Sequence, residues 1–169
     1  MKSKNNIIFF GFKGSGKTYF AKRLALRLNR VHIDTDHLVE GEFGSPSYEI
    51  VRAIGEKEFR LLENKVIASL ASFENSIISL GGGSLLDPQN QTVLLNLGKL
   101  IYLDTDVELL KKRILTGPFP SFLDPLDFET SFAKVYQKRK ILYESFPALR
   151  IKTSGKSDET VLDEILNQL

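Results

Sequence analysis

Glycine, lysine and threonine residues near the amino terminus follow a fixed spacing. Gly11, Gly16, Lys17 and Thr18 fit the pattern G-x-x-x-x-G-K-[ST], in which a short loop joins a strand to a helix. Glycines let the backbone approach a phosphate closely, and successive N–H groups then form an anion-binding nest. The lysine can reach the terminal phosphates, and the threonine hydroxyl suits Mg²⁺, which prefers oxygen ligands. We therefore expect ATP and Mg²⁺ to bind, with nucleotide contacts from Gly14, Ser15, Gly16, Lys17, Thr18 and Tyr19.

Two carboxylates follow the next apolar run, in "HIDTDHLVE". Asp34 and Asp36 are two positions apart, so on an extended segment they share a side. Beside a magnesium nucleotide, one carboxylate can help to hold the metal ion and the other can accept a proton from the attacking hydroxyl. The alternative is that one of them only caps the following helix. We interpret the flanking His32 and His37 as structural or surface residues.

An arginine and a glycine run suggest contacts with a second ligand. Arg60 lies between Glu56 and Glu63 at helical spacing. It is either part of an ordinary ion-paired helix surface or an arginine that Glu63 orients toward a substrate carboxylate. The three consecutive glycines of "SLGGGSLL" follow a buried-strand pattern. Because glycine costs chain entropy, we expect this backbone to pass close to a ligand.

These residues lie between short apolar runs and longer amphipathic segments. Strands are predicted at residues 7–10, 31–33, 76–80, 99–104 and 149–153. Helices are predicted at residues 17–29, 55–73 and 88–97, from Asp106 to about 115, at 128–146, and from Asp158 to about 169, with the two aspartates as caps. Residues 116–127 are rich in proline and are expected to form a loop. Alternating strands and helices predict a parallel sheet covered on both faces, with ligands bound beyond the carboxyl ends of its strands.

Composition limits the possible classes of protein. The chain has 169 residues, which is typical of a single domain. With 23 basic and 21 acidic residues, its charge is too balanced for nucleic acid or an anionic membrane to be the main partner. It has no cysteine, so disulfides and thiolate chemistry are excluded. No apolar stretch is long enough for a membrane span. We expect a cytoplasmic protein.

Five segments in order resemble the shikimate kinase family over nearly the whole chain: "GFKGSGKT", "IDTD", "EIVRAIGEKEFRLLE", "SLGGGSLL" and "KRKILYE". The resemblance implies one P-loop kinase domain over residues 1–169, with three α/β/α layers and a five-stranded parallel sheet in the order 2-3-1-4-5. It implies a lid at about 112–126 and substrate-binding helices at about 35–62. The implied reaction is ATP-dependent phosphorylation of the 3-hydroxyl of shikimate, in aromatic amino-acid biosynthesis. We expect a monomer.

The resemblance also implies roles for single residues. Asp36 matches the acid that binds the substrate hydroxyls and can act as base, and Asp34 matches the acid on the Mg²⁺ side. Arg60 and Arg139 match the two arginines that bind the shikimate carboxylate, although Arg139 alone, in a basic helix, would be interpreted as solvated. The remaining matches are Gly82 for substrate contact, Lys17 for the phosphates, Thr18 for Mg²⁺ and Arg113 for the adenine side.

The lid departs from the family pattern. Where the family usually has R-P-L-L, this chain has Phe119-Pro120-Ser121-Phe122, and no Lys or Arg occurs from 115 to 133. The basic run at 111–113 could reach the phosphates instead. Alternatively, Lys17, Mg²⁺ and Lys13 could suffice. At the position of Lys13 the family more often has an apolar residue. Alternatively, catalysis has decayed and the protein is a non-catalytic nucleotide-binding module. Another small-molecule kinase, such as one for gluconate, is the remaining alternative.

Overall fold

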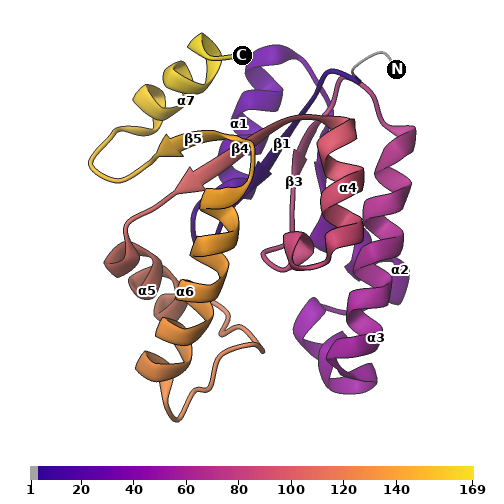
Figure 1. Ribbon diagram of the computed structural model, residues 1–169, viewed down its shortest axis with the longest axis vertical. Helices are drawn as coiled ribbons and strands as arrows, with labels where there is room; N and C mark the ends of the chain where they lie inside the picture. The colour runs from indigo at the N-terminus through magenta and orange to yellow at the C-terminus, as the bar shows by residue number, and fades with distance from the viewer. Residues whose placement is uncertain (1–3) are drawn as a thin grey trace.

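The computed structural model describes residues 4–169 and contains one parallel β-sheet at its centre (Figure 1). The strand order is β2-β3-β1-β4-β5, which confirms the predicted order. In register, Ile8 of β1 lies opposite Ile78 of β3 and Leu100 of β4. The strands are β1 Asn6–Phe10, β2 His32–Asp34, β3 Ile77–Ser79, β4 Gly98–Asp104 and β5 Leu149–Lys152.

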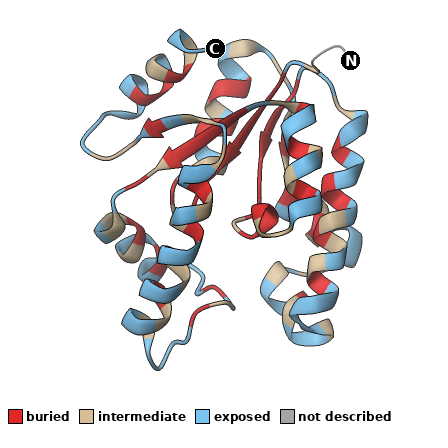
Figure 2. Ribbon diagram, in the orientation of Figure 1, coloured by how far each residue is buried: buried red, intermediate tan, exposed pale blue. Residues whose placement is uncertain are grey.

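Helices cover both faces of the sheet, because alternate residues of the buried central strand point to opposite sides. Ile7 and Phe9 pack against α1 and α7, whereas Ile8 and Phe10 pack against the other helices. Figure 2 shows the buried residues following the strands and the inward helix faces. The helices are α1 Lys17–Leu28, α2 Thr35–Phe43, α3 Ser47–Ser69, α4 Pro88–Leu97, α5 Val107–Thr116, α6 Phe128–Ser145 and α7 Asp158–Asn167, with short 3₁₀ turns η1 Leu70–Ser72 and η2 Ser84–Leu86.

Three predicted boundaries need correction. The helix expected from residue 55 is the second part of α3, which begins at Ser47 and breaks at Gly55, where φ is +82°. The last helix is capped by Ser157, whose hydroxyl accepts from the Thr160 amide, and not by Asp158. Residues 112–116, expected to belong to the lid, are the last turn of α5. We therefore use "lid" for residues 117–127.

The carboxyl ends of the strands all point toward one edge of the sheet, where the chemically interesting residues gather. Residues 11–16 follow β1, Asp34 ends β2, and Gly81–Gly83 follow β3. The lid and α6 flank this edge on one side, and α2 with the first part of α3 flanks it on the other (Figure 1). Among residues 4–169, no helix combines the length and apolarity needed to cross a membrane.

Candidate active site

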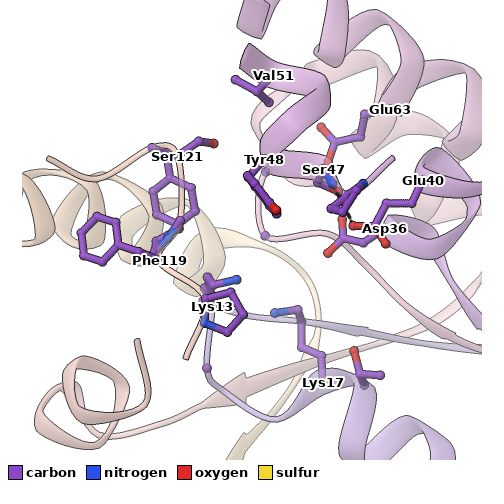
Figure 3. Close-up of a pocket in the computed structure, with 18 of the residues that line it drawn as sticks. Lys13, Lys17, Asp36, Glu40, Ser47, Tyr48, Val51, Glu63, Phe119 and Ser121 are labelled. Carbon is purple, nitrogen blue, oxygen red and sulfur yellow. Dashed lines mark hydrogen bonds between the residues drawn. The ribbon is translucent and has the colours of Figure 1, made fainter. Parts of the chain in front are cut away.

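A cleft of about 950 Å³ opens at this edge of the sheet. Its walls come from the phosphate loop, α2, α3, the glycine run after β3, α6 and the lid. Figure 3 shows charged side chains from several of these elements directed into the same space. The cleft contains most of the predicted site residues: Gly14, Gly16, Lys17, Thr18, Tyr19, Asp36, Arg60, Gly82, Arg113 and Arg139. Ser15 and Asp34 lie directly beneath them.

The phosphate loop has the backbone that its glycines make possible. Gly14 and Gly16 have φ values of +87° and +91°, which other residues rarely adopt. The Lys17 ammonium donates to the Phe12 carbonyl at 3.1 Å. Burial lowers the Lys17 pKa to about 8, against the opposing effect of Asp36 and Asp34. One expected amide is already used within the loop, since the Ser15 N–H donates to Phe12 at 3.1 Å.

Asp34 lies at the centre of a small hydrogen-bond network. Its Oδ2 accepts from the hydroxyls of Thr18 and Ser79, each at 2.7 Å. Its Oδ1 accepts from the Asp36 and His37 amides and thereby caps α2. Burial alone would raise the pKa of Asp34, but these hydrogen bonds outweigh it and the pKa lies below its usual value. Asp34 is therefore both the predicted cap and an ionised carboxylate beside the Thr18 hydroxyl.

Asp36 has the opposite electrostatic environment. Its side chain is exposed to the solvent of the cleft. The surrounding protein nevertheless desolvates it, and the charge of Asp34 adds to this effect, so that the pKa of Asp36 is raised to about 6 despite the attraction of Lys17. A carboxylate with this pKa can take up a proton near neutral pH.

Each glycine of the run after β3 leaves room for a charged group. A Cβ on Gly81 would collide with the Asp36 carboxylate, and one on Gly83 would collide with the Arg60 guanidinium. A Cβ on Gly82 would come within 3.3 Å of Arg139 Nη1. The glycine run therefore lies against side chains that line the cleft, and its approach to a ligand stays a prediction.

Arg60 is held in the orientation that the sequence suggested. Its Nη1 donates to Glu63 Oε2 at 2.7 Å, and its Nη2 donates to Glu56 Oε1 at 3.2 Å. Glu63 is only 3% exposed and accepts a further hydrogen bond from Ser84 Oγ at 3.0 Å. Burial opposes the charge of Arg60, but the two glutamates outweigh burial and raise its pKa. The ion-paired arginine therefore lines the cleft, and its contact with a substrate carboxylate stays a prediction.

Arg139 is not a solvated helix residue, because it is only 3% exposed. Burial lowers the pKa of its guanidinium, which still remains charged at neutral pH. The guanidinium carbon lies 4.2 Å from the ring centre of Phe122 in the lid. Within residues 4–169, its Nη1 is buried with no hydrogen-bond partner. A buried charged donor without a partner is costly, so its position on the cleft wall favours an anionic ligand.

Two further predicted nucleotide contacts, Arg113 and Tyr19, also line the cleft. Arg113 of α5 is exposed and donates to the Gly14 carbonyl at 2.7 Å. The Tyr19 hydroxyl donates to Asp158 at 2.6 Å, which joins α1 to the start of α7. Arg113 is therefore anchored on the phosphate loop, and Tyr19 is anchored at the start of the helix that follows it.

Sequence reasoning missed Ser79, Ser84 and Phe122 as parts of the site. Ser79 supports Asp34, Ser84 supports Glu63, and Phe122 stacks on Arg139. Ser84 directly follows the glycine run and Ser79 lies two residues before it, so closeness to this run in the sequence was the available signal. The Phe122 contact joins distant segments, and no local pattern indicates it.

Comparisons with known proteins give one consistent result. A family model described as shikimate kinase matches residues 13–169. The shikimate kinase of Symbiobacterium thermophilum is 36% identical over 174 residues, which cover 97% of this chain and 95% of that protein. A shikimate kinase structure from Acinetobacter baumannii, in complex with shikimate, has a TM-score of 0.90 at 29% identity and covers 97% of this chain and 92% of its own. One from Aquifex aeolicus has a TM-score of 0.80 at 28% identity, covering 96% and 94%.

The family match includes the phosphate-loop lysine and threonine, both aspartates, the glycine run and both arginines, because all of them lie between residues 13 and 169. The relatives match over nearly their full length, so the likeness extends beyond the widespread phosphate loop. The chain belongs to the shikimate kinase family.

Proposed function

We propose that this chain transfers the γ-phosphoryl group of ATP to the 3-hydroxyl of shikimate. The observation that carries the proposal is the pair of arginines on one wall of the cleft. Arg139 has a buried Nη1 without a partner in the described residues, and Arg60 Nη1 donates a hydrogen bond to Glu63. Both adjoin the glycine run. Two oriented guanidinium groups suit the carboxylate of shikimate, since arginine forks match carboxylate oxygens.

The hydroxyl chemistry is proposed for Asp36. A carboxylate with a pKa of about 6 is mostly ionised at pH 7 and can accept the proton of the attacking hydroxyl. Lys17 and the amides of the phosphate loop bind the ATP phosphates and hold the phosphoryl group in line. We propose that Arg113, whose guanidinium donates to the Gly14 carbonyl of the same loop, contacts the adenine side of the nucleotide.

We propose Thr18 and Asp34 as the protein groups that hold Mg²⁺, directly and through water. Their oxygens lie 2.7 Å apart, and oxygen is the ligand that Mg²⁺ prefers. Among residues 4–169 there is no cluster of three or more His, Cys, Asp or Glu side chains able to hold a metal, so nucleotide oxygens and waters would complete the coordination. Bound there, Mg²⁺ would neutralise phosphate charge.

We propose that the protein acts as a monomer. Light scattering on the purified protein tests this. We also propose a cytoplasmic location, because ATP is the phosphoryl donor and a chain without cysteine suits a reducing compartment. The net charge of +2 supports neither nucleic acid nor a membrane surface as a partner.

The test is ADP release from MgATP with shikimate, with gluconate and with neither. We expect release that depends on shikimate. Release with gluconate alone would assign the protein to a neighbouring activity. ATP binding without release in any arm would mean that the protein is a nucleotide-binding module that has lost catalysis.

A further inference from the structure

Among residues 4–169, five cationic side chains line the cleft: Lys13, Lys17, Arg60, Arg113 and Arg139. Three of them donate hydrogen bonds to the protein: Arg60 to its two glutamates, Arg113 to the Gly14 carbonyl and Lys17 to the Phe12 carbonyl. In the described part of the chain, Arg139 Nη1 has no hydrogen-bond partner, and Lys13 takes part in none of the ion pairs that hold Arg60 and Lys111. The shikimate carboxylate accounts for Arg139, but it leaves Lys13 without a role.

Lys13 lies where the phosphate side of the cleft meets the acceptor side. It belongs to the phosphate loop, yet its backbone nitrogen lies only 3.9 Å from the position that a Cβ on Gly82 would occupy. Lys13 and Lys17 line the same cleft. Burial is the main cause of the lowered pKa of Lys17, and the charge of Lys13 adds to it. Figure 3 shows both lysines between the lid residues on one side and Asp36 on the other.

The lid covers this region with side chains that carry no charge. Pro118, Phe119, Pro120, Ser121 and Phe122 all line the cleft. Phe122 stacks on Arg139, and Phe119 packs edge-on against Phe128 of α6 at 6.1 Å. Such a lid can exclude water, but it cannot stabilise the negative charge that spreads over the phosphoryl oxygens during transfer.

We propose that Lys13 supplies the positive charge on the transferred phosphoryl group that the lid lacks. The inference rests on the proposed function. In that reaction the hydroxyl oxygen of shikimate forms a bond to the γ-phosphorus, and the bond from this phosphorus to the β–γ bridging oxygen breaks. The electron pair leaves with ADP, and the hydroxyl proton passes to Asp36. The Lys13 ammonium contacts an equatorial oxygen of the phosphoryl group while this group passes from the β–γ bridging oxygen to the shikimate hydroxyl oxygen.

The test compares steady-state kinetics of the unaltered protein with Lys13→Met, Lys13→Arg and the control Lys65→Met. Lys65 is an exposed lysine of α3 outside the cleft. We expect Lys13→Met to lower kcat about 10²-fold, as does loss of a single charge-stabilising donor in other enzymes. Both KM values should change little, because the contact is made in the transition state. Lys13→Arg should retain most of the activity, Lys65→Met all of it, and each variant should melt like the unaltered protein.

Two kinetic outcomes would overturn the role of Lys13 while the unaltered protein remains active. One is an unchanged kcat in Lys13→Met. The other is a raised KM for shikimate with kcat retained, which would make Lys13 a ground-state contact of the acceptor. If the unaltered protein releases no ADP in response to shikimate, the proposed function itself fails, and this result is seen before any variant is measured.

A second variant places the charge on the lid. Phe119→Arg should raise kcat of Lys13→Met several-fold, but should raise it little or not at all when Lys13 is present. Such coupling is expected when two cationic groups stabilise the same negative charge on the phosphoryl oxygens. An equal effect of Phe119→Arg in both backgrounds would mean that the two positions act independently, and the proposal would be wrong.

Discussion

Asp34 and Asp36 are two residues apart, yet their environments shift their pKa values in opposite directions. Hydrogen bonds from Thr18 and Ser79 keep Asp34 ionised, whereas desolvation and the neighbouring charge of Asp34 raise the pKa of Asp36. Two carboxylates whose pKa values differ in this way suit different chemical tasks. The ionised member suits a cation, and the member that titrates near pH 6 suits proton transfer.

This difference predicts the pH dependence of kcat/KM, which reports groups of the free enzyme. The base must be unprotonated, so activity should fall as the pH drops below about 6, the pKa of Asp36. Lys17 must be protonated, so kcat/KM for ATP should fall as the pH rises above about 8. Asp36→Asn should lower kcat by about 10²- to 10⁴-fold, the usual contribution of a general base, and remove the acidic limb.

The comparison for this profile is Asp124→Asn, which alters an exposed carboxylate of the lid outside the cleft lining. It should leave the profile unchanged. An acidic limb that persists in the residual activity of Asp36→Asn would assign the titration to another group and remove Asp36 as the base.

Residue types alone could predict the phosphate loop and both aspartates, since the chemistry of each is local. They could not predict the burial of Arg139. Its helix is basic, and the residue is buried only because Phe122 and Phe12, from distant segments, pack on its guanidinium. The prediction that Arg139 belongs to the site came from the resemblance to the shikimate kinase family, and not from the residue pattern of its helix.

Among the elements, the glycine run after β3 controls how the site is assembled. Gly83 has ordinary negative φ, −101°, so its importance is not conformational. Its missing Cβ leaves the space that the Arg60 guanidinium fills. The run thus sets the position of an arginine on α3 through contact, without a hydrogen bond between them.

Gly83→Ala should therefore weaken shikimate binding and leave ATP binding nearly unchanged. The new methyl group displaces the flexible end of Arg60 and not the backbone, so the fold should be retained. Loss of one charged hydrogen bond costs about 1.5 kcal/mol, or about tenfold in Kd. Titration calorimetry with each ligand measures this. The matched control is Gly41→Ala in α2, where the added methyl group meets nothing. Equal weakening of both ligands would contradict the contact.

Elements with strong local signals are predicted well. The helix over 88–97 has a proline at its start and a glycine after its end, and the structure places α4 at these residues. Helix α2 gives little apolar periodicity, because it buries only Thr35 and Val39. The first part of α3 buries only Ile50. The resemblance, not the periodicity, predicted helices there. Likewise, the alternation of strands and helices along the chain predicts a parallel sheet. It does not predict the strand order, which depends on contacts between distant segments.

At the scale of the whole molecule, the proposed function assigns the two substrates to different elements of one fold. The nucleotide side consists of the phosphate loop, α1 and Arg113. The acceptor side consists of α3, the glycine run and α6. Lys17 belongs to the first group, and its removal should affect the two ligands unequally.

Ligand-induced stabilisation tests this division without measuring turnover. A ligand at 100 times its Kd stabilises the native state by about 2.7 kcal/mol, which is roughly 5–10 °C in Tm for a chain of this size. We expect MgATP and shikimate each to raise Tm. In Lys17→Met the shift with MgATP should largely disappear, and the shift with shikimate should remain, because Arg60 and Arg139 are untouched. An undiminished ATP shift in this variant would remove Lys17 as a phosphate ligand. A shift with ATP but none with shikimate in the unaltered protein would show that the acceptor side does not bind shikimate.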